Sequence, residues 1–182
     1  MAGTELSPLP RLHGSQAPAS DPRRHVWLSA SAGTGKTQVL AARVFRLLLR
    51  GVDPGAILCL TFTKAGAAEM AARITGRLAH WVRAKDHDLR VDLVALGESA
   101  TPDLIERART LFAKVLDAPG GGIRIQTIHG FCQSLLSAFP VEAGLVPGFR
   151  PIEAREEAVM AREARLYFLG RPGRGLLGRR GW

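Results

Sequence analysis

The chain has 182 residues, of which 46% are hydrophobic and 23% charged, enough apolar material for one packed domain. Its formal net charge is +9, mostly from arginine, since lysine occurs only at Lys36, Lys64, Lys85 and Lys114. A basic balance suits a nucleic-acid partner, although GC-rich coding alone also enriches a sequence in Ala, Arg and Gly. No stretch has the length of a membrane span and the first residues lack a signal-peptide pattern, so we expect a cytoplasmic protein with no membrane partner.

The N-terminal part predicts an arm, a strand and a helix. Residues 1–24 are rich in Pro, Ser, Gly and Ala, which favours a flexible, extended arm. The apolar run at residues 26–31 predicts a buried strand, and the small residues 32–35 predict a turn. A helix is expected over residues 36–50, ended by Gly51 and Pro54. Its apolar stripe contains Val39, Leu40, Val44, Leu47 and Leu48.

The middle of the chain continues the alternation of strands and helices. Residues 56–63 predict a second buried strand, and residues 65–84 predict a helix with Met70, Ile74, Leu78 and Trp81 on one face. Residues 85–96 are mixed and give no clear assignment. A further helix is expected over residues 102–117, because Thr101 is a good cap and Pro102 suits the first helical position.

The last elements complete an α/β pattern. Residues 119–122 predict a turn, residues 123–127 a strand and residues 129–139 a helix that stops at Pro140. Strands separated by helices favour a parallel sheet. The two cysteines, Cys59 and Cys132, lie in apolar stretches without metal-ligand spacing, which predicts buried, reduced thiols.

The C-terminal tail changes character abruptly. Residues 151–169 predict a helical segment, whereas residues 170–182 are Gly- and Arg-rich and predict no structure. The tail is either a basic nucleic-acid-binding segment or an out-of-frame translation, and the abrupt change favours the second. The expected organisation is therefore an arm at 1–24, a partial α/β domain at 25–150, a helix at 151–169 and an unstructured tail at 170–182.

One motif carries specific chemistry. Residues 30–37 have the spacing of a nucleotide-binding P-loop, in the order Ala30, Ser31, Ala32, Gly33, Thr34, Gly35, Lys36, Thr37. The glycines allow backbone N–H groups to surround phosphates, and the helix that follows adds its positive end. Lys36 would contact the β- and γ-phosphates of ATP, and the Thr37 hydroxyl would bind Mg²⁺. A chance Gly-rich turn is the alternative, but a predicted strand before the loop and a helix after it favour the P-loop.

Further motifs give a family resemblance. The P-loop is followed by LTFTKAGAAEM at residues 60–70 and by IQTIHGFC at residues 125–132. In this order the motifs resemble the UvrD-like superfamily-one DNA helicases, most of all the AddA type of double-strand-break repair helicase–nucleases. The resemblance covers residues 16–155 and implies a RecA-like parallel α/β core, ATP and Mg²⁺ as cofactors, and single-stranded or duplex-end DNA as partner. A second helicase–nuclease subunit of the AddB type and a location at the bacterial nucleoid are also implied.

The resemblance assigns DNA contacts to five residues. Phe62 would stack on a base, while Thr63, Lys64, Thr127 and His129 would contact phosphates. The alternatives are a core aromatic for Phe62 and a structural role for His129. Gly66 stands where alanine is usual, at a cost of about 1 kcal/mol inside a helix.

The resemblance also assigns Gln16 to the adenine of ATP, because an amide can both donate to and accept from adenine's edge. The alternative is a solvated surface glutamine.

One expected element is missing from the sequence. Hydrolysis by this family needs a buried strand that ends in Asp-Glu, and no such run is present. We therefore expect an N-terminal helicase fragment whose sheet is incomplete at its C-terminal side and which is inactive by itself. The alternative is a short P-loop protein that binds nucleotide or DNA without turnover. A GTPase is disfavoured, because Thr63-Lys64-Ala65-Gly66 lacks the Asp of a guanine-reading motif.

Overall fold

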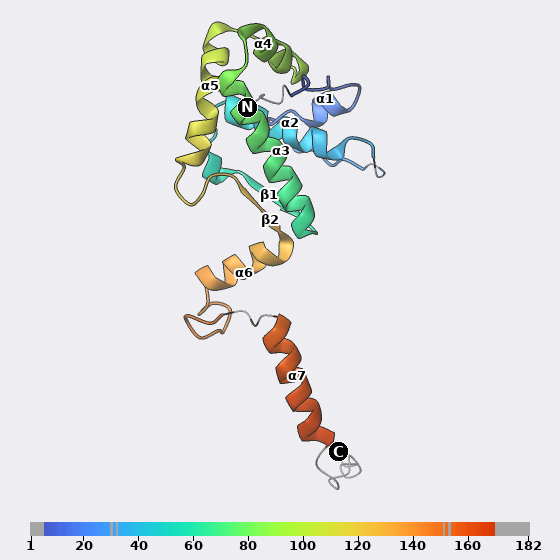
Figure 1. Ribbon diagram of the computed structural model, residues 1–182, viewed down its shortest axis with the longest axis vertical. Coiled ribbons are helices and arrows are strands. Elements are labelled where there is room, and N and C mark those ends of the chain that lie inside the picture. The colour runs from blue at the N-terminus through green and yellow to red at the C-terminus, as the bar shows by residue number, and fades with distance from the viewer. Residues whose placement is uncertain (1–5, 30, 32, 151, 153, 170–182) are drawn as a thin grey trace, which may run out of the picture. The chain divides into compact units, whose positions relative to one another are not determined.

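The computed structural model describes residues 6–29, 31, 33–150, 152 and 154–169 (Figure 1). The chain divides into two compact units, Met1–Phe131 and Cys132–Trp182, and each is described by itself. The buried core belongs to the first unit. In the described residues, no helix has the length and apolar character needed to cross a membrane.

Helix α2 (Lys36–Leu49) follows the P-loop sequence, as predicted. It ends where Gly51 N donates to Leu48 O at 2.9 Å and Val52 N donates to Leu47 O at 3.1 Å. This pair of hydrogen bonds requires a residue in the left-handed conformation just after the helix, and Gly51 adopts it at φ 86°. The prediction is wrong for Leu40, which is 49% exposed. The prediction is confirmed for Val39, Val44 and Leu48, and the buried face extends from them to Ala41, Ala42, Phe45 and Leu49.

A two-stranded parallel sheet follows. A single turn, η1 (Pro54–Ala56), leads into β1 (Leu58–Thr61), which pairs with β2 (Arg124–Thr127). The register sets Leu58 opposite Arg124 and Thr61 opposite Thr127. Both strands were predicted, but not their exposure: β1 alternates between exposed and partly buried residues.

Three helices connect β1 to β2, as parallel strands require. They are α3 (Lys64–Arg83), α4 (Asp86–Ala95) and α5 (Pro102–Leu116). Thr101 caps α5 as predicted, since its Oγ1 accepts a hydrogen bond from Leu104 N at 3.4 Å. Helix α3 contacts both strands and packs most extensively on α5.

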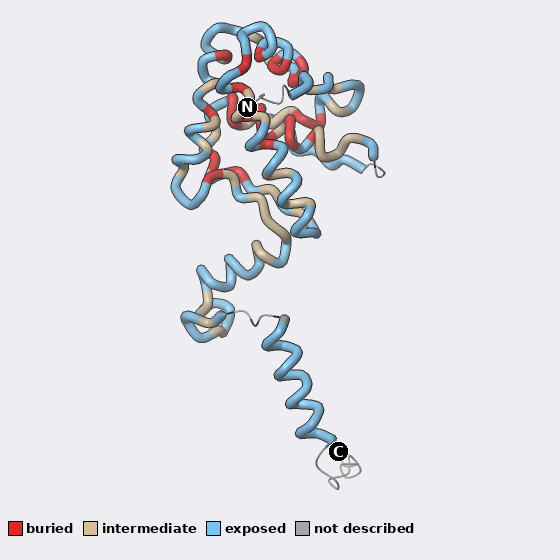
Figure 2. The backbone as a smooth tube through the Cα atoms, in the orientation of Figure 1, coloured by how far each residue is buried: buried red, intermediate tan, exposed pale blue. Residues whose placement is uncertain are grey.

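The core lies among these helices and α2 (Figure 2). The rings of Phe45 and Trp81 lie at its centre, with centroids 5.1 Å apart. The predicted face of α3 is confirmed, because Ile74, Leu78 and Trp81 are at most 1% exposed. Burial of such large side chains is the main favourable term for this fold.

The N-terminal arm is attached to this core. Leu9 and Leu12 pack against it, and a short helix, α1 (Gln16–Ala19), follows. The prediction of an extended arm is therefore wrong for these residues. Hydrogen bonds attach these residues to the core: Leu9 N donates to Asp92 Oδ1 at 2.7 Å, and Arg77 Nη2 donates to Ser7 O at 2.8 Å.

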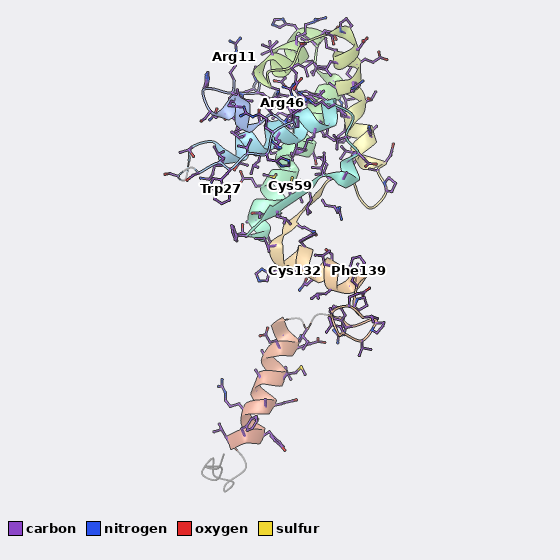
Figure 3. All side chains as sticks on the ribbon, turned by 180° about the vertical axis from the view of Figure 1, so that it is seen from behind. Arg11, Trp27, Arg46, Cys59, Cys132 and Phe139 are labelled. Atoms are coloured by element: carbon purple, nitrogen blue, oxygen red, sulfur yellow. The ribbon has the colours of Figure 1, made fainter. Side chains whose placement is uncertain are left out.

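The predicted strand at residues 26–31 is absent from its described part. Residues 25–29 adopt no regular structure, and Trp27 is 93% exposed. Figure 3 labels both Trp27 and Arg46, which differ sharply in exposure, since Arg46 is buried. The described sheet contains β1 and β2 alone, so this run has no hydrogen-bonded neighbour. An apolar run without a neighbour cannot satisfy a strand's backbone groups.

Helix α6 (Ile128–Ala138) starts in the first unit, and α7 (Ala154–Leu169) belongs to the second. Both agree with the predicted helices, and residues 170–182 lie outside the described residues. Cys59 and Cys132 are free thiols, but Cys132 is exposed, so its predicted burial is wrong. Burial raises the pKa of the Cys59 thiol, which stays protonated at neutral pH.

Asp92→Ala should strongly destabilise the first unit. Asp92 is 2% exposed and accepts hydrogen bonds from Leu9 N, from Trp81 Nε1 at 2.7 Å and from Arg77 Nη1 at 3.2 Å. Removing the carboxylate leaves these donors unpaired, and we expect a loss of about 3 kcal/mol or more in urea unfolding. Glu106→Ala, an exposed carboxylate on α5, is the control and should change stability by less than about 0.5 kcal/mol. Equal effects of the two variants would contradict the structure.

Candidate nucleotide and nucleic-acid site

Two glycines give the described part of the predicted phosphate loop its turns. Gly33 and Gly35 both adopt the left-handed region, at φ 78° and 84°, and Gly35 is the N-cap of α2. Thr34 Oγ1 donates to Ser31 O at 2.7 Å, and Lys36 Nζ donates to the same carbonyl. These bonds close the loop on itself. Ala30 and Ala32 lie outside the described residues.

The start of α2 is suited to phosphate. Its first turn contains no acidic residue, and its N-cap, Gly35, has no side chain that could cap it. The positive end of the helix dipole favours an anion at this position. Lys36 and Thr37, the first two residues of α2, are both partly buried beside the loop.

Gln16 lies next to this loop, although 19 positions separate it from Gly35. A Cβ atom placed on Gly35 would be 3.1 Å from Gln16 Nε2 and 3.6 Å from Gln38 Oε1. The Oε1 atom of Gln16 accepts a hydrogen bond from His13 N at 3.1 Å. Gln16 is partly buried, unlike a fully solvated surface residue. The structure thus brings together the glutamine and the phosphate loop that the sequence analysis singled out.

A second group of candidate residues gathers where β1 and β2 end. Thr61 and Thr127 are paired across the sheet, so the residues that follow β1 and β2 leave it at the same edge. Thr63 caps α3 and Thr127 precedes α6, and each hydroxyl accepts a hydrogen bond from an amide three residues later: Gly66 N at 3.0 Å and Gly130 N at 3.1 Å. A hydroxyl that accepts in this way still has its proton to donate.

The candidates for DNA contact at this edge are accessible. Phe62 is 87% exposed, so the alternative of a core aromatic is wrong for the described fold. Thr63, Lys64 and His129 are exposed as well.

Sequence reasoning missed why Gly66 is a glycine. A Cβ at this position would lie 3.0 Å from both Thr61 Oγ1 and Thr63 Oγ1, a tighter contact than side chains normally make. The shared spacing is visible in the sequence, since Thr63 and Thr127 are each followed by a glycine three residues later.

Within the described residues, His, Cys, Asp and Glu form no group of three or more that could hold a metal ion.

Comparison with known proteins decides the family. Residues 13–167 match the UvrD/REP helicase N-terminal domain. The chain belongs to this family. Membership implies a RecA-like P-loop fold, to which the small parallel sheet and the helices around it correspond. The UvrD/REP match includes Gln16, the phosphate loop and the edge formed by β1 and β2.

Among the chain's relatives are proteins named as ATP-dependent helicase/nuclease subunits of the AddA type. The one from Latilactobacillus sakei is 32% identical over 152 residues, which are 83% of this chain and 15% of the relative. Those from Pelotomaculum thermopropionicum and Lactobacillus acidophilus are 34% and 30% identical, over 74% and 87% of this chain and 9% and 11% of their own length. The UvrD/REP chain therefore spans a small share of the relatives it matches.

Thr63→Ala should destabilise the start of α3. The Thr63 hydroxyl accepts from Gly66 N, and loss of such a cap costs about 1 kcal/mol. Thr63→Ser keeps the hydroxyl and should stay near wild type. Thr75→Ala, at an exposed position inside the same helix, is the matched control for losing a hydroxyl elsewhere. Urea unfolding measures the stability of each variant. Identical midpoints for Thr63→Ala and Thr63→Ser would argue against the cap.

Proposed function

We propose that the chain is the ATP- and DNA-binding N-terminal part of an ATP-dependent DNA helicase, an ATP hydrolase that acts in double-strand-break repair and recombination. The observation that carries this proposal is the position of Gln16 beside Gly35 at the start of α2. The family and the names of the relatives support it. Because the chain spans at most 15% of the relatives described above, the activity of the whole protein is part of the proposal.

ATP would bind at the N-terminus of α2. The backbone of residues 30–37 would surround the phosphates, with Lys36 as a mobile positive charge and Thr37 as a ligand of Mg²⁺. A cation bound there would neutralise phosphate charge. Gln16 would read the adenine, since its Nε2 group lies beside Gly35 of the loop. These roles use the left-handed glycines and the half-buried first turn of α2.

DNA would bind at the edge where β1 and β2 end. Phe62 would stack on a base and grip any sequence, because every base has a π-face. Thr63, Lys64, Thr127 and His129 would contact phosphates of a single strand or a duplex end. Three of these four residues, Thr63, Lys64 and His129, are exposed, and Thr127 is partly buried. The Thr63 and Thr127 hydroxyls accept from backbone amides and can still donate to a phosphate, which supports this assignment.

The remaining parts of the proposal follow from the same assignment. The sheet of β1 and β2 would be part of a larger parallel sheet, incomplete here at its C-terminal side, within a partial ATP-binding domain at residues 25–150. A second helicase–nuclease subunit of the AddB type would be the protein partner, in the bacterial cytoplasm at the nucleoid. Family membership favours this proposal over a short P-loop protein that binds without turnover.

Lys36→Ala should lower the affinity for ATP by about tenfold or more. The change removes the positive charge at the start of α2, where hydrogen bonds to charged groups contribute about 1.5–3 kcal/mol. Lys114→Ala removes an equal charge from an exposed position on α5 and should leave ATP binding unchanged. Isothermal titration calorimetry with the full chain measures both. Unchanged affinity in Lys36→Ala would refute the phosphate-loop assignment.

Phe62→Ala should weaken binding of single-stranded DNA by about tenfold, since one base stack contributes about 1–3 kcal/mol. Trp27→Ala removes another strongly exposed aromatic side chain and is the control. Fluorescence anisotropy with a labelled oligothymidylate at several salt concentrations is the measurement. Affinity should also fall as salt rises, because phosphate contacts release counterions. Salt-independent binding, or equal losses in the two variants, would count against the DNA assignment.

A further inference from the structure

Two arginines of α2 hold the segment that carries Gln16. Arg43 Nη1 donates to Asp21 O at 2.7 Å, and Arg43 Nη2 donates to Arg24 O at 2.7 Å. Arg46 Nη1 donates to Ser20 Oγ at 2.7 Å, and longer bonds of 3.4 Å reach Ala17 O from Arg46 and Ala19 O from Arg43. The carbonyls at the end of a helix lack partners within it, and here guanidinium groups supply them at the end of α1.

Arg46 is fixed in this position by a buried ion pair. Arg46 is 8% exposed, and its Nε donates to Glu98 Oε1 at 2.7 Å. Arg50 Nη2 lies 3.5 Å from the same carboxylate oxygen. A buried guanidinium must keep its counterion and its hydrogen bonds, so it cannot move without a large cost. Figure 3 labels Arg46 among the packed helices of the first unit.

The bonded end of α1 is one turn from Gln16. Ser20 is fully buried, and its N–H donates to Gln16 O at 3.0 Å. Fixing Ser20 therefore fixes the backbone of Gln16. At the other end of α2, Gly35 lies beside the Gln16 side chain. The phosphate loop and the base-reading residue are thus positioned by one rigid helix.

We infer that Arg46, assisted by Arg43, is a positioning residue that holds Gln16 against the phosphate loop and so sets the preference for adenine over guanine nucleotides. The inference rests on the proposed function, because it assumes that the loop binds a nucleoside triphosphate. Neither arginine has to touch the nucleotide. Releasing α1 moves the amide of Gln16 and leaves the loop and the start of α2 in place.

The test separates recognition of the base from recognition of the phosphates. Affinities for ATP, GTP and inorganic tripolyphosphate are measured by calorimetry on the full chain. Ser20→Ala and Arg43→Ala should each reduce the ATP-to-GTP affinity ratio about three- to tenfold, the effect of one hydrogen bond, while tripolyphosphate affinity stays unchanged. Arg43→Lys keeps a donor and should recover part of the ratio. Arg46→Lys should lower the ratio as well, because one ammonium group cannot replace the guanidinium of Arg46, which bonds both Glu98 and Ser20.

Arg107→Ala is the matched control. Arg107 Nη1 donates to Leu49 O at 2.9 Å, so this variant also removes a guanidinium–carbonyl bond at a helix end, but far along α2 from the loop. It should leave the nucleotide ratio unchanged. Ser20→Ala keeps every charge in place, so it decides the question if an Arg46 variant fails to fold.

The outcomes distinguish this inference from the proposed function. A wild-type chain that binds no tripolyphosphate refutes the proposed function, and the inference with it. A chain that binds tripolyphosphate but shows equal ATP and GTP affinities overturns the inference alone. Folded Ser20→Ala and Arg43→Ala variants with a wild-type ratio overturn it as well. A reduced ratio in both, with Arg107→Ala unchanged, supports it.

Discussion

The carboxylate of Asp92 is the contact on which the arrangement of the first unit depends. It is buried and accepts from the N-terminal arm and from two side chains of α3, so it ties α4, α3 and the arm together. One of its donors, Trp81, also packs on Phe45 of α2. Burying a charge without hydrogen-bond partners costs several kcal/mol. The three donors must therefore stay in contact with the Asp92 carboxylate when the unit is folded. The orientation of the P-loop helix is therefore linked to a carboxylate on a different helix.

A second buried charge fixes the arm at its other end. Arg46 bonds Ser20 and Glu98, whereas Asp92 bonds Leu9. Gln16 lies between these two anchors, which explains how a segment rich in Pro, Ser and Gly is ordered beside the loop. Asp21 adds a local contribution: the side-chain and backbone hydrogen bonds from Arg23 hold the pKa of its carboxyl well below the usual range, so Asp21 stays charged in mild acid. Order in the arm comes from polar contacts to side chains distant in sequence.

These contacts explain which elements could be predicted from the sequence. Helices α2, α3 and α5 were predicted because their apolar periodicity and their ends are local properties: Gly51 and Thr101 act on neighbouring residues. The P-loop was predicted because the glycine spacing itself determines the backbone. Helix α4 received no assignment because Asp92, a charged residue, occupies one of its buried positions and interrupts the apolar pattern. The identity of its three donors cannot be found from periodicity.

In the described residues, the predictions of an extended arm and of a strand at residues 26–31 fail for opposite reasons. Carbonyls of the arm find guanidinium partners 19–70 positions away, and such pairs leave no repeating signal in a single sequence. At residues 26–29 the apolar pattern is strong, but the neighbours are missing from the described sheet. A strand's apolar residues are buried only when other elements cover them, and Leu60 at 44% and Trp27 at 93% exposure lack such cover. The apolar pattern of these two segments therefore fits a sheet with more neighbours than β1 and β2 supply to each other, which is the larger sheet that we propose.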